Sequence, residues 1–382
     1  MPMGPRWRRA TTAFGKRKKW ARRFDLRFDY FLYFCGENGK KEIERSMAAA
    51  AGPVSHGDIE IAGVGGGGKK GPSAVPPSFL RWKNLSVQVP RKGPGGGTTN
   101  ILTNVSAYVR PGSVLAIMGS SGCGKSTLLE VLSRRKEGRV SGEIEFNGKT
   151  CFAKTTVDAA DAAQQPHEVF LDSLGFVQQF DQFLPNLTCA ESLLYTSRLV
   201  LPRDMSDEER QKRVRQSLER VGIANIANNR IGATSDQVRI SGGQRRRLSL
   251  AQELLVNPRV LFLDEPTSGL DAASALIVMQ ILRKLADGGM SIAITMHQPR
   301  DEIFAMIDDL LLLKSGSVVY FGAAKTCVEY FAGIGLPNER IQNPADFAID
   351  VVCTNDAVFE TLERMSLQHQ MMCRQRAKEA PS

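Results

Sequence analysis

Short, mainly apolar stretches separated by helical patterns make up the second half of the sequence. They occur at Val260–Leu263, Ser291–Thr295 and Leu310–Leu313. Another is predicted at Ser113–Met118, where a Gly-rich turn follows and a helix then runs over residues 126–134. Because short apolar runs are typical of buried strands, their alternation with helices predicts a parallel sheet covered by helices on its faces.

The segment before this alternation has a different pattern. Leu80–Val89 and Asn100–Val109 are expected to be strands around the loop Gly93–Gly97, and Ser141–Phe146 adds a third strand. Strands joined by a Gly-rich turn predict an antiparallel β patch. Residues 151–168 have the polar composition of a loop insertion.

One helix start is marked clearly by its capping residues. Ser206 is followed by three acids, Asp207–Glu209, which is the pattern of a capping box with negative charge in the first turn. The helix should end before Gly222. Its apolar positions share one face: Val214, Leu218 and Val221.

Net charge is concentrated at the N-terminus. The 382 residues carry a formal charge of +10, and residues 1–46 contain 13 Lys/Arg against 5 Asp/Glu. Residues 1–46 are therefore either a basic arm or transit peptide, or an over-extended start, because Met47 is a plausible initiator. Residues 47–78 have the Ala, Gly, Pro and Ser content of a linker. The remainder is nearly neutral, so no nucleic-acid partner is expected for it.

Cysteine usage and apolar run length exclude two further classes. The 7 cysteines are scattered and never form a CxxC pair, which argues against a disulfide framework or a zinc site. The longest uninterrupted apolar run is Tyr30–Cys35. A spanning helix needs about 20 apolar residues, so this chain is not expected to cross a membrane on its own.

A nucleotide-binding motif follows the first predicted parallel strand. Residues 119–126 fit the pattern G-x-x-x-x-G-K-[ST], in which backbone N–H groups and a helix N-terminus surround a phosphate. Lys125 then faces the β- and γ-phosphates, and the Ser126 hydroxyl is available to Mg²⁺. The residues predicted to cradle the nucleotide are Gly119, Ser120, Ser121, Gly122, Cys123, Gly124, Lys125, Ser126 and Thr127.

Cys123 lies inside this motif, close to a helix N-terminus and to a lysine. Both features lower a thiol pKa. A reactive thiolate is therefore one interpretation of Cys123, and a small residue tolerated at a variable position is the simpler one.

The strand Val260–Leu263 ends in two acids, Asp264 and Glu265. Asp264 suits a position beside Mg²⁺, and Glu265 suits the general base that activates water for attack on the γ-phosphate. An acidic pair after a strand is more often a helix cap or a turn. The catalytic interpretation is favoured here because the acidic pair follows a phosphate loop in the sequence.

Further motifs occur in a fixed order around these two. The segment Ile240–Gln244 resembles the signature of ABC ATPases, Gln179 matches the Q-loop, Ser268–Asp271 the D-loop, and His297 the switch histidine. The chain is thus similar to ABC ATPases. This resemblance implies an α/β P-loop NTPase fold of ABC type: a mostly parallel core sheet, an antiparallel β subdomain and a helical subdomain.

The resemblance also implies a division of labour between two copies. Two such domains sandwich two ATP molecules, and Ser241 and Gly243 of one subunit face the γ-phosphate held by the other. Three arginines, 245–247, beside the positive end of the signature helix would repel one another and so favour an incoming anion. The implied roles are catalysis by Glu265 and His297, Mg²⁺ binding by Ser126, Gln179 and Asp264, and nucleotide contacts by Gln179, Ser241, Gly242, Gly243, Gln244 and Asp271.

Four segments resemble the G subfamily, the white/brown-complex half-transporters: Gly175–Gln179, Pro185–Thr188, Ile294–Pro299 and Asn343–Phe347. The similarity covers Phe79–Val352, with residues 79–349 expected to be the ATPase domain and 350–382 a connector. It implies a membrane-associated homodimer or heterodimer, with the ATPase domain on the cytoplasmic side, exporting a lipophilic substrate. A membrane domain of six helices is expected in such proteins but expected to be absent from this chain.

Two positions depart from the family pattern, and two other functions stay open. Val89 stands where many relatives carry an aromatic that stacks on adenine, and Phe180 stands where an acid usually follows the Q-loop glutamine. A soluble ABC ATPase with a regulatory or ribosome-associated role is one alternative, although such factors usually carry two ATPase modules. A nucleotide-binding module without turnover is disfavoured because every catalytic position is filled.

Overall fold

The protein is described by a computed structural model. Contacts divide the chain into two units, Met1–Ala74 and Val75–Ser382, and the described residues all belong to the second. They are residues 78–90, 97–136, 139–154, 168–232, 240–338 and 343–354. The predicted basic extension, most of the linker, most of the loop 93–97 and most of the connector 350–382 lie outside them, and the proposed domain boundaries stay predictions.

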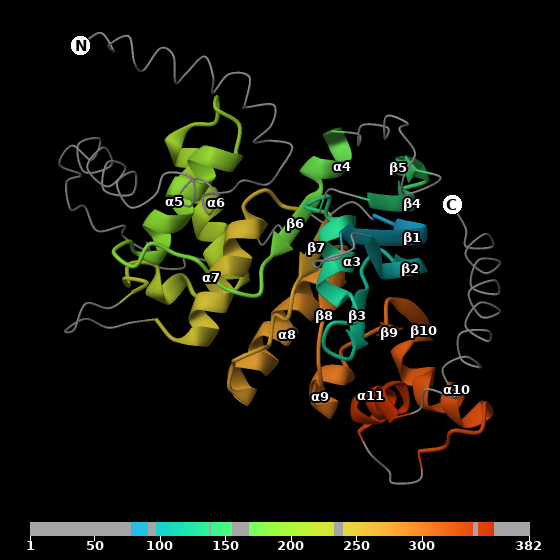
Figure 1. Cartoon of the computed structure of the whole chain (residues 1–382). Coiled ribbons are helices and arrows are strands. Elements are labelled where there is room, and N and C mark those ends of the chain that lie inside the picture. Colours follow the sequence, from blue (N-terminus) through green and yellow to red (C-terminus); the bar gives the residue numbers. More distant parts are fainter. Residues whose placement is uncertain are drawn as a thin grey trace. The chain divides into compact units, whose positions relative to one another are not determined.

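A six-stranded sheet forms the centre of the second unit (Figure 1). Its strand order is β10-β9-β3-β8-β7-β6, and all neighbours are parallel except β10 and β9. The predicted parallel sheet is therefore confirmed. The strands are β3 (Val114–Gly119), β6 (Leu174–Val177), β7 (Val260–Leu263), β8 (Ser291–Thr295), β9 (Asp309–Lys314) and β10 (Ser317–Ala323).

A second sheet is antiparallel, in the order β2-β1-β4-β5, which confirms the predicted β patch. The expectation of a loop over 151–168 is wrong at both described ends, because residues 151–154 continue a hairpin strand and residue 168 begins a helix. The strands are β1 (Leu80–Pro90), β2 (Thr98–Val109), β4 (Arg139–Phe146) and β5 (Lys149–Lys154).

Glu145 joins two of these strands through a charge cluster. Its carboxylate on β4 accepts hydrogen bonds from Arg81 and Lys83 on β1, with the Lys83 Nζ at 2.5 Å. Burial acts to raise the pKa of Glu145, but the bonds from Lys83 and Arg81 outweigh it and hold the pKa below its ordinary value. We call these three residues the Glu145 cluster.

Helices cover the central sheet and form a separate group to one side of it. Figure 1 shows α5, α6 and α7 together in that group, which confirms the expected helical subdomain. α6 begins after the capping box of Ser206 and ends at Arg220, close to the predicted bounds. In the parts of the chain that the structure describes, no helix combines the length and apolar character needed to span a membrane. The helices are α3 (Lys125–Leu132), α4 (Glu168–Asp172), α5 (Cys189–Val200), α6 (Asp207–Arg220), η1 (Ala224–Ile226), α7 (Gly242–Leu254), α8 (Ala272–Asp287), α9 (Asp301–Phe304), η2 (Ala324–Thr326), α10 (Cys327–Gly333) and α11 (Pro344–Thr354).

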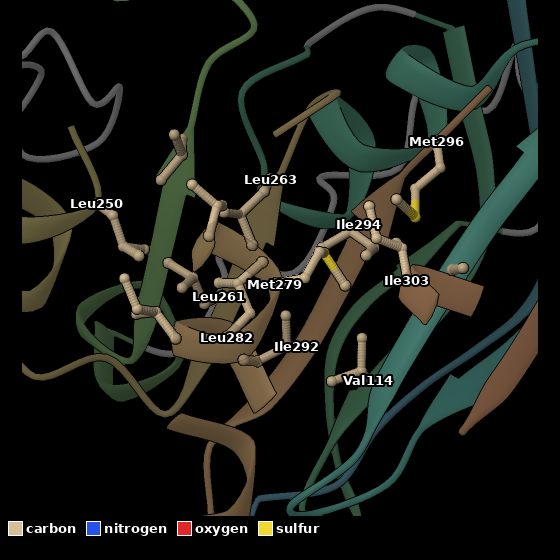
Figure 2. Close-up of a cluster of buried hydrophobic side chains, with 14 of the residues drawn as sticks. Val114, Leu250, Leu261, Leu263, Met279, Leu282, Ile292, Ile294, Met296 and Ile303 are labelled. Atoms are coloured by element: carbon tan, nitrogen blue, oxygen red, sulfur yellow. The ribbon is translucent and has the colours of Figure 1, made fainter. Parts of the chain in front are cut away.

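Two apolar cores lie on opposite faces of the central sheet. Along β3, Val114 and Met118 belong to one core and Leu115 and Ile117 to the other, as the two-residue period of a strand requires. Figure 2 shows the first core, where side chains of β7 and β8 meet those of α7 and α8. The second core joins the sheet to α3 and to the antiparallel strands, and it includes the fully buried Trp82.

At the β6 edge of the central sheet, a side chain binds an outward-facing backbone donor. β6 is the last strand, and its Phe176 N–H, which points away from β7, donates to the Glu253 Oε2 at 3.0 Å. Glu253 extends from α7 and is buried. A backbone donor at the sheet edge is thereby satisfied within the fold.

Candidate functional site

The predicted phosphate loop lies between β3 and α3, at the carboxyl end of a parallel strand. Gly119 and Gly124 have φ values of +147° and +104°, which only glycine adopts without strain. A Cβ on Gly119 would lie 2.2 Å from the Leu313 carbonyl oxygen of β9. The close approach of β9 therefore leaves no room for a side chain at Gly119, and the N-terminus of α3 follows directly after the loop, where its N–H groups can bind an anion.

Lys125 is the first residue of α3, and its side chain returns over the loop. Its Nζ donates to the carbonyl oxygens of Gly119 at 2.8 Å and Ser120 at 2.9 Å. The residue is buried, so a positive charge is held at the centre of the loop. Among the other predicted cradle residues, Ser121 and Gly122 are exposed, and the Thr127 hydroxyl accepts from Lys136 Nζ at 3.3 Å.

The surroundings of Cys123 favour the simpler of its two interpretations, because the residue is buried. It is 3% exposed, and its Sγ lies 4.0 Å from the Lys125 Nζ. Burial raises the pKa of the thiol, and this effect exceeds the lowering by Lys125. The interpretation as a low-pKa thiolate is therefore wrong, because the approach of neighbouring chain segments removes the sulfur from water.

Ser126 and Asp264 meet behind the loop. The Ser126 Oγ donates to the Asp264 Oδ1 at 3.0 Å, although the two residues are 138 positions apart. Thr295, fully buried at the end of β8, donates to the same oxygen at 2.6 Å. A hydroxyl beside a carboxylate is a hard oxygen donor set that fits Mg²⁺, which takes its other ligands from phosphates and water. The described residues contain no group of three or more His, Cys, Asp or Glu that could hold a metal ion.

Glu265 is held between two other predicted site residues. Its Oε2 accepts from Gln179 Nε2 at 2.7 Å, and its Oε1 lies 2.6 Å from His297 Nε2. Its backbone has φ +46°, an uncommon conformation for a side chain of this size, and its N–H donates to Thr295 Oγ1 at 2.8 Å. The structure thus places the Gln179 side chain against the Glu265 carboxylate, to which it donates a hydrogen bond.

The signature residues lie elsewhere. Ser241 caps α7: its Oγ accepts from the Gln244 N–H at 3.2 Å, while Gln244 Oε1 accepts from the Ser241 N–H at 2.8 Å. Ser241 and Gly242 are exposed, whereas Gly243 is buried. Figure 1 shows α7 well apart from α3, so the N-terminus of the signature helix does not complete the phosphate loop of its own chain.

The predicted D-loop residue Asp271 caps α8 beside the signature. Its Oδ1 accepts from the Ser274 N–H at 2.9 Å, and hydrogen bonds from Ser274 hold the pKa of Asp271 below its ordinary value. A Cβ on Gly243 would lie 2.6 Å from the Ser274 Oγ. The starts of α7 and α8 are therefore packed directly together, which explains the glycine at this signature position.

Two residues important to this geometry were missed by the sequence analysis: Thr295 was not singled out, and Arg246 was considered only as one of three neighbouring arginines. Thr295 bonds to both members of the acidic pair, and its signal is a hydroxyl at the end of a buried strand, two residues before His297. Arg246 is 3% exposed and contacts the segments that carry Gln179 and Glu265. Its position within a run of arginines gave no sign of burial.

A phosphate loop after one parallel strand and an acidic pair after another define a P-loop nucleotide-binding domain. Residues 102–268 match the family model described as ABC transporter, and residues 297–374 match the one described as ABC-2 type transporter. Together with the relatives below, these matches identify the described domain as an ABC transporter ATP-binding domain of the kind found in the G family.

The relatives are similar over the described domain. ABC transporter G family member 13 of Arabidopsis thaliana is 41% identical over 270 residues, covering 70% of this chain and 37% of the relative. ATP-binding cassette sub-family G member 8 of Homo sapiens is 38% identical over 280 residues, covering 72% and 38%. ABC transporter G family member 1 of Dictyostelium discoideum is 38% identical over 273 residues, covering 71% and 33%. The chain thus spans about a third of the length of these relatives.

The second family match corrects one prediction. The membrane domain was expected to be absent from this chain, but residues 297–374 match the ABC-2 type transporter, a membrane-domain family. The described part of this stretch forms β9, β10 and the helices α9 to α11. The match supports membrane association and favours a transporter over the soluble regulatory alternative, which no feature of the described residues supports.

Proposed function

We propose that this chain binds and hydrolyses MgATP, and that its domain pairs with a second such domain to power transport across a membrane. The observation that carries the proposal is the position of Glu265, held between Gln179 and His297 beside the Ser126–Asp264 pair. These groups come from four separate chain segments. Their convergence is what hydrolysis of a phosphoanhydride requires.

The proposed roles of the residues in phosphate binding and in proton transfer follow from their chemistry. Lys125 and the N–H groups at the start of α3 bind the β- and γ-phosphates, because a buried cation and a helix N-terminus both attract anions. Glu265 accepts a proton from the attacking water, oriented by Gln179 on one oxygen and His297 on the other. Thr295 holds the Glu265 backbone, so the carboxylate does not need to reorganise when nucleotide arrives.

Ser126, Asp264 and Gln179 are the proposed residues around Mg²⁺. The metal ion supplies positive charge that stabilises negative charge developing on the phosphates. In this arrangement Asp264 orients the Ser126 hydroxyl, and Thr295 in turn orients Asp264.

The second half of each site is proposed to come from a partner domain. Ser241 and Gly242 are exposed at the free N-terminus of α7, which is an anion-binding position with no phosphate loop of its own chain beside it. Gly243, Gln244 and Asp271 shape this surface. We therefore propose a homodimer, or a heterodimer with another half-transporter, whose ATPase domains lie on the cytoplasmic side of the membrane.

The test uses the full chain and the substitution Glu265→Gln. It should preserve binding of MgATP and lower the hydrolysis rate by about 10²–10⁴-fold, the usual contribution of a general base. Because ATP is then not consumed, sedimentation should detect an ATP-dependent dimer.

Glu219→Gln on α6 provides a matched control. Glu219 is exposed and lies on α6, which carries none of the proposed site residues, so this variant should hydrolyse ATP at the wild-type rate. Undiminished turnover in Glu265→Gln would remove Glu265 from its proposed role. A protein that stays monomeric at saturating MgATP would contradict the shared sites.

A further inference from the structure

The Arg246 guanidinium occupies the junction of three segments of the proposed site. Its Nη2 donates to the Gln179 carbonyl at 2.8 Å and to the Glu265 carbonyl at 3.1 Å. Its Nη1 donates to the Gln178 carbonyl at 2.5 Å, and its Nε to the Pro266 carbonyl at 3.2 Å. One nitrogen thus connects the backbones of the two residues whose side chains form the Gln179–Glu265 hydrogen bond.

The positive charge of Arg246 is balanced by Asp181, which packs against the face of α7 that carries Arg246 and Ser249. Asp181 Oδ1 accepts from Arg246 Nη1 at 3.0 Å and from the Ser249 hydroxyl at 2.7 Å. Arg246 is 3% exposed and the Asp181 side chain 13%, so solvent weakens this pair little. The acid missing at Phe180 is thus present one residue later, where it pairs with α7.

The five N–H donors of the guanidinium have five acceptors: four backbone carbonyls and the Asp181 carboxylate. The sequence-based expectation of three arginines repelling one another is wrong for Arg246, whose charge is directed into the fold. A lysine has only three donors, grouped on one atom, and cannot replace this fork.

We propose that Arg246 is a positioning residue for hydrolysis, which acts by holding Gln179 and Glu265 at the spacing that orients the carboxylate. This inference rests on the proposed function. Glu265 has the uncommon φ of +46°, and its two backbone polar groups are both bound by side chains, by Thr295 at the N–H and by Arg246 at the carbonyl, which also accepts from the Ser268 N–H at 3.1 Å. Because Arg246 is on α7, its contact connects the signature helix to the backbone of the residue that carries the carboxylate.

Arg246→Lys in the full chain is the central test. We expect kcat to fall by about 100-fold, the loss that a displacement of about 1 Å produces, with little change in KM. The binding affinity for MgATP should stay within about twofold of wild type, because the hydrogen bonds of Arg246 go to residues 178–181 and 265–266 and not to the phosphate loop.

Arg210→Lys is the matched control. Arg210 is 5% exposed, and its guanidinium also binds three backbone carbonyls, those of Ser197, Pro202 and Met205, but in the helical subdomain. The two variants should lose similar thermal stability, while only Arg246→Lys loses kcat. Equal losses of kcat in both variants would overturn the proposal.

A double mutant separates positioning from a general structural defect. In the Glu265→Gln background, adding Arg246→Lys should lower the residual turnover by no more than about twofold, because the carboxylate on which Arg246 acts is already removed. A further loss of about 100-fold would show an action independent of Glu265 and would refute the proposal.

If Arg246→Lys does not fold, Asp181→Asn replaces it, because it preserves the side-chain shape and removes the balancing charge. It should lower kcat by about tenfold without changing KM, and wild-type kcat in that variant would overturn the inference. Failure of the proposed function would be recognised separately. In that case the wild-type protein would show either no ATP turnover or a turnover that Glu265→Gln leaves unchanged.

Discussion

Replacing Thr295 by valine tests the arrangement of the acidic pair most directly. The substitution preserves the shape of a fully buried side chain and deletes its hydroxyl. Two hydrogen bonds are lost: the one donated to the Asp264 Oδ1 at 2.6 Å and the one accepted from the Glu265 N–H at 2.8 Å. Valine can replace neither of them.

The magnitude follows from the nature of the two bonds. A hydrogen bond to a carboxylate contributes about 1.5–3 kcal/mol and a neutral one about 1 kcal/mol, so Thr295→Val should destabilise the protein by about 2.5–4 kcal/mol. For a domain of this size each kcal/mol lowers Tm by about 2–4 °C, which gives a decrease of about 5–15 °C.

Thermal unfolding followed by circular dichroism measures this decrease, with Thr295→Ser as the control. Serine keeps the hydroxyl and loses one buried methyl group, which costs about 1 kcal/mol and lowers Tm by about 2–4 °C. Hydrolysis should follow the same order, with valine slower than serine, because the Glu265 backbone is released. Valine and serine variants of equal Tm would refute the assignment of both hydrogen bonds.

Three further substitutions or modifications test other parts of the structure. Lys125→Ala should weaken MgATP binding by about 10–150-fold in calorimetry, because a charge-assisted contact to the phosphates is lost, and unchanged affinity would contradict the phosphate-loop assignment. The pKa of Glu145 is lower in the folded protein than in the unfolded chain, so the Glu145 cluster stabilises the folded state fully at a pH above the unfolded-state pKa. This stabilisation is lost as the pH falls through the lower pKa of the folded state. Stability of Glu145→Gln should therefore depend less on pH between about 5 and 3, and identical pH profiles for the two proteins would exclude this role. Because burial raises the pKa of Cys123, a maleimide should modify it more slowly than the exposed Cys353, as measured by peptide mass spectrometry; faster labelling of Cys123 would mean that the loop opens.

The sequence predicts most of the parallel sheet because its strands are buried on both faces. The expected bounds of the strands Val260–Leu263 and Ser291–Thr295 agree with the structure. β6 was not predicted, since four residues that include a glycine carry too little pattern to separate a strand from a loop. The motif order likewise identified the family, but it could not give contacts between segments distant along the chain.

Arg246 and Cys123 show where local patterns mislead. An arginine within Arg245–Arg247 has the pattern of surface charge, and it is buried only because Gln178–Asp181 and Glu265–Pro266 meet above α7. The environment of Cys123 depends on burial by segments distant in the sequence, including β9, which passes against the loop at Gly119. Both outcomes depend on tertiary packing, which no short window of sequence contains.

The capped edge of β6 limits how two of these domains can join. An outermost strand with free backbone donors is a template for another chain, and extension of a sheet in this way leads to intermolecular growth. Here the outward N–H of Phe176 is already bound to Glu253, so a foreign strand would have to displace a buried carboxylate. In the proposed dimer, pairing at this edge is therefore not expected, and the loops at the carboxyl ends of the strands, where the nucleotide motifs lie, are the expected contact surface.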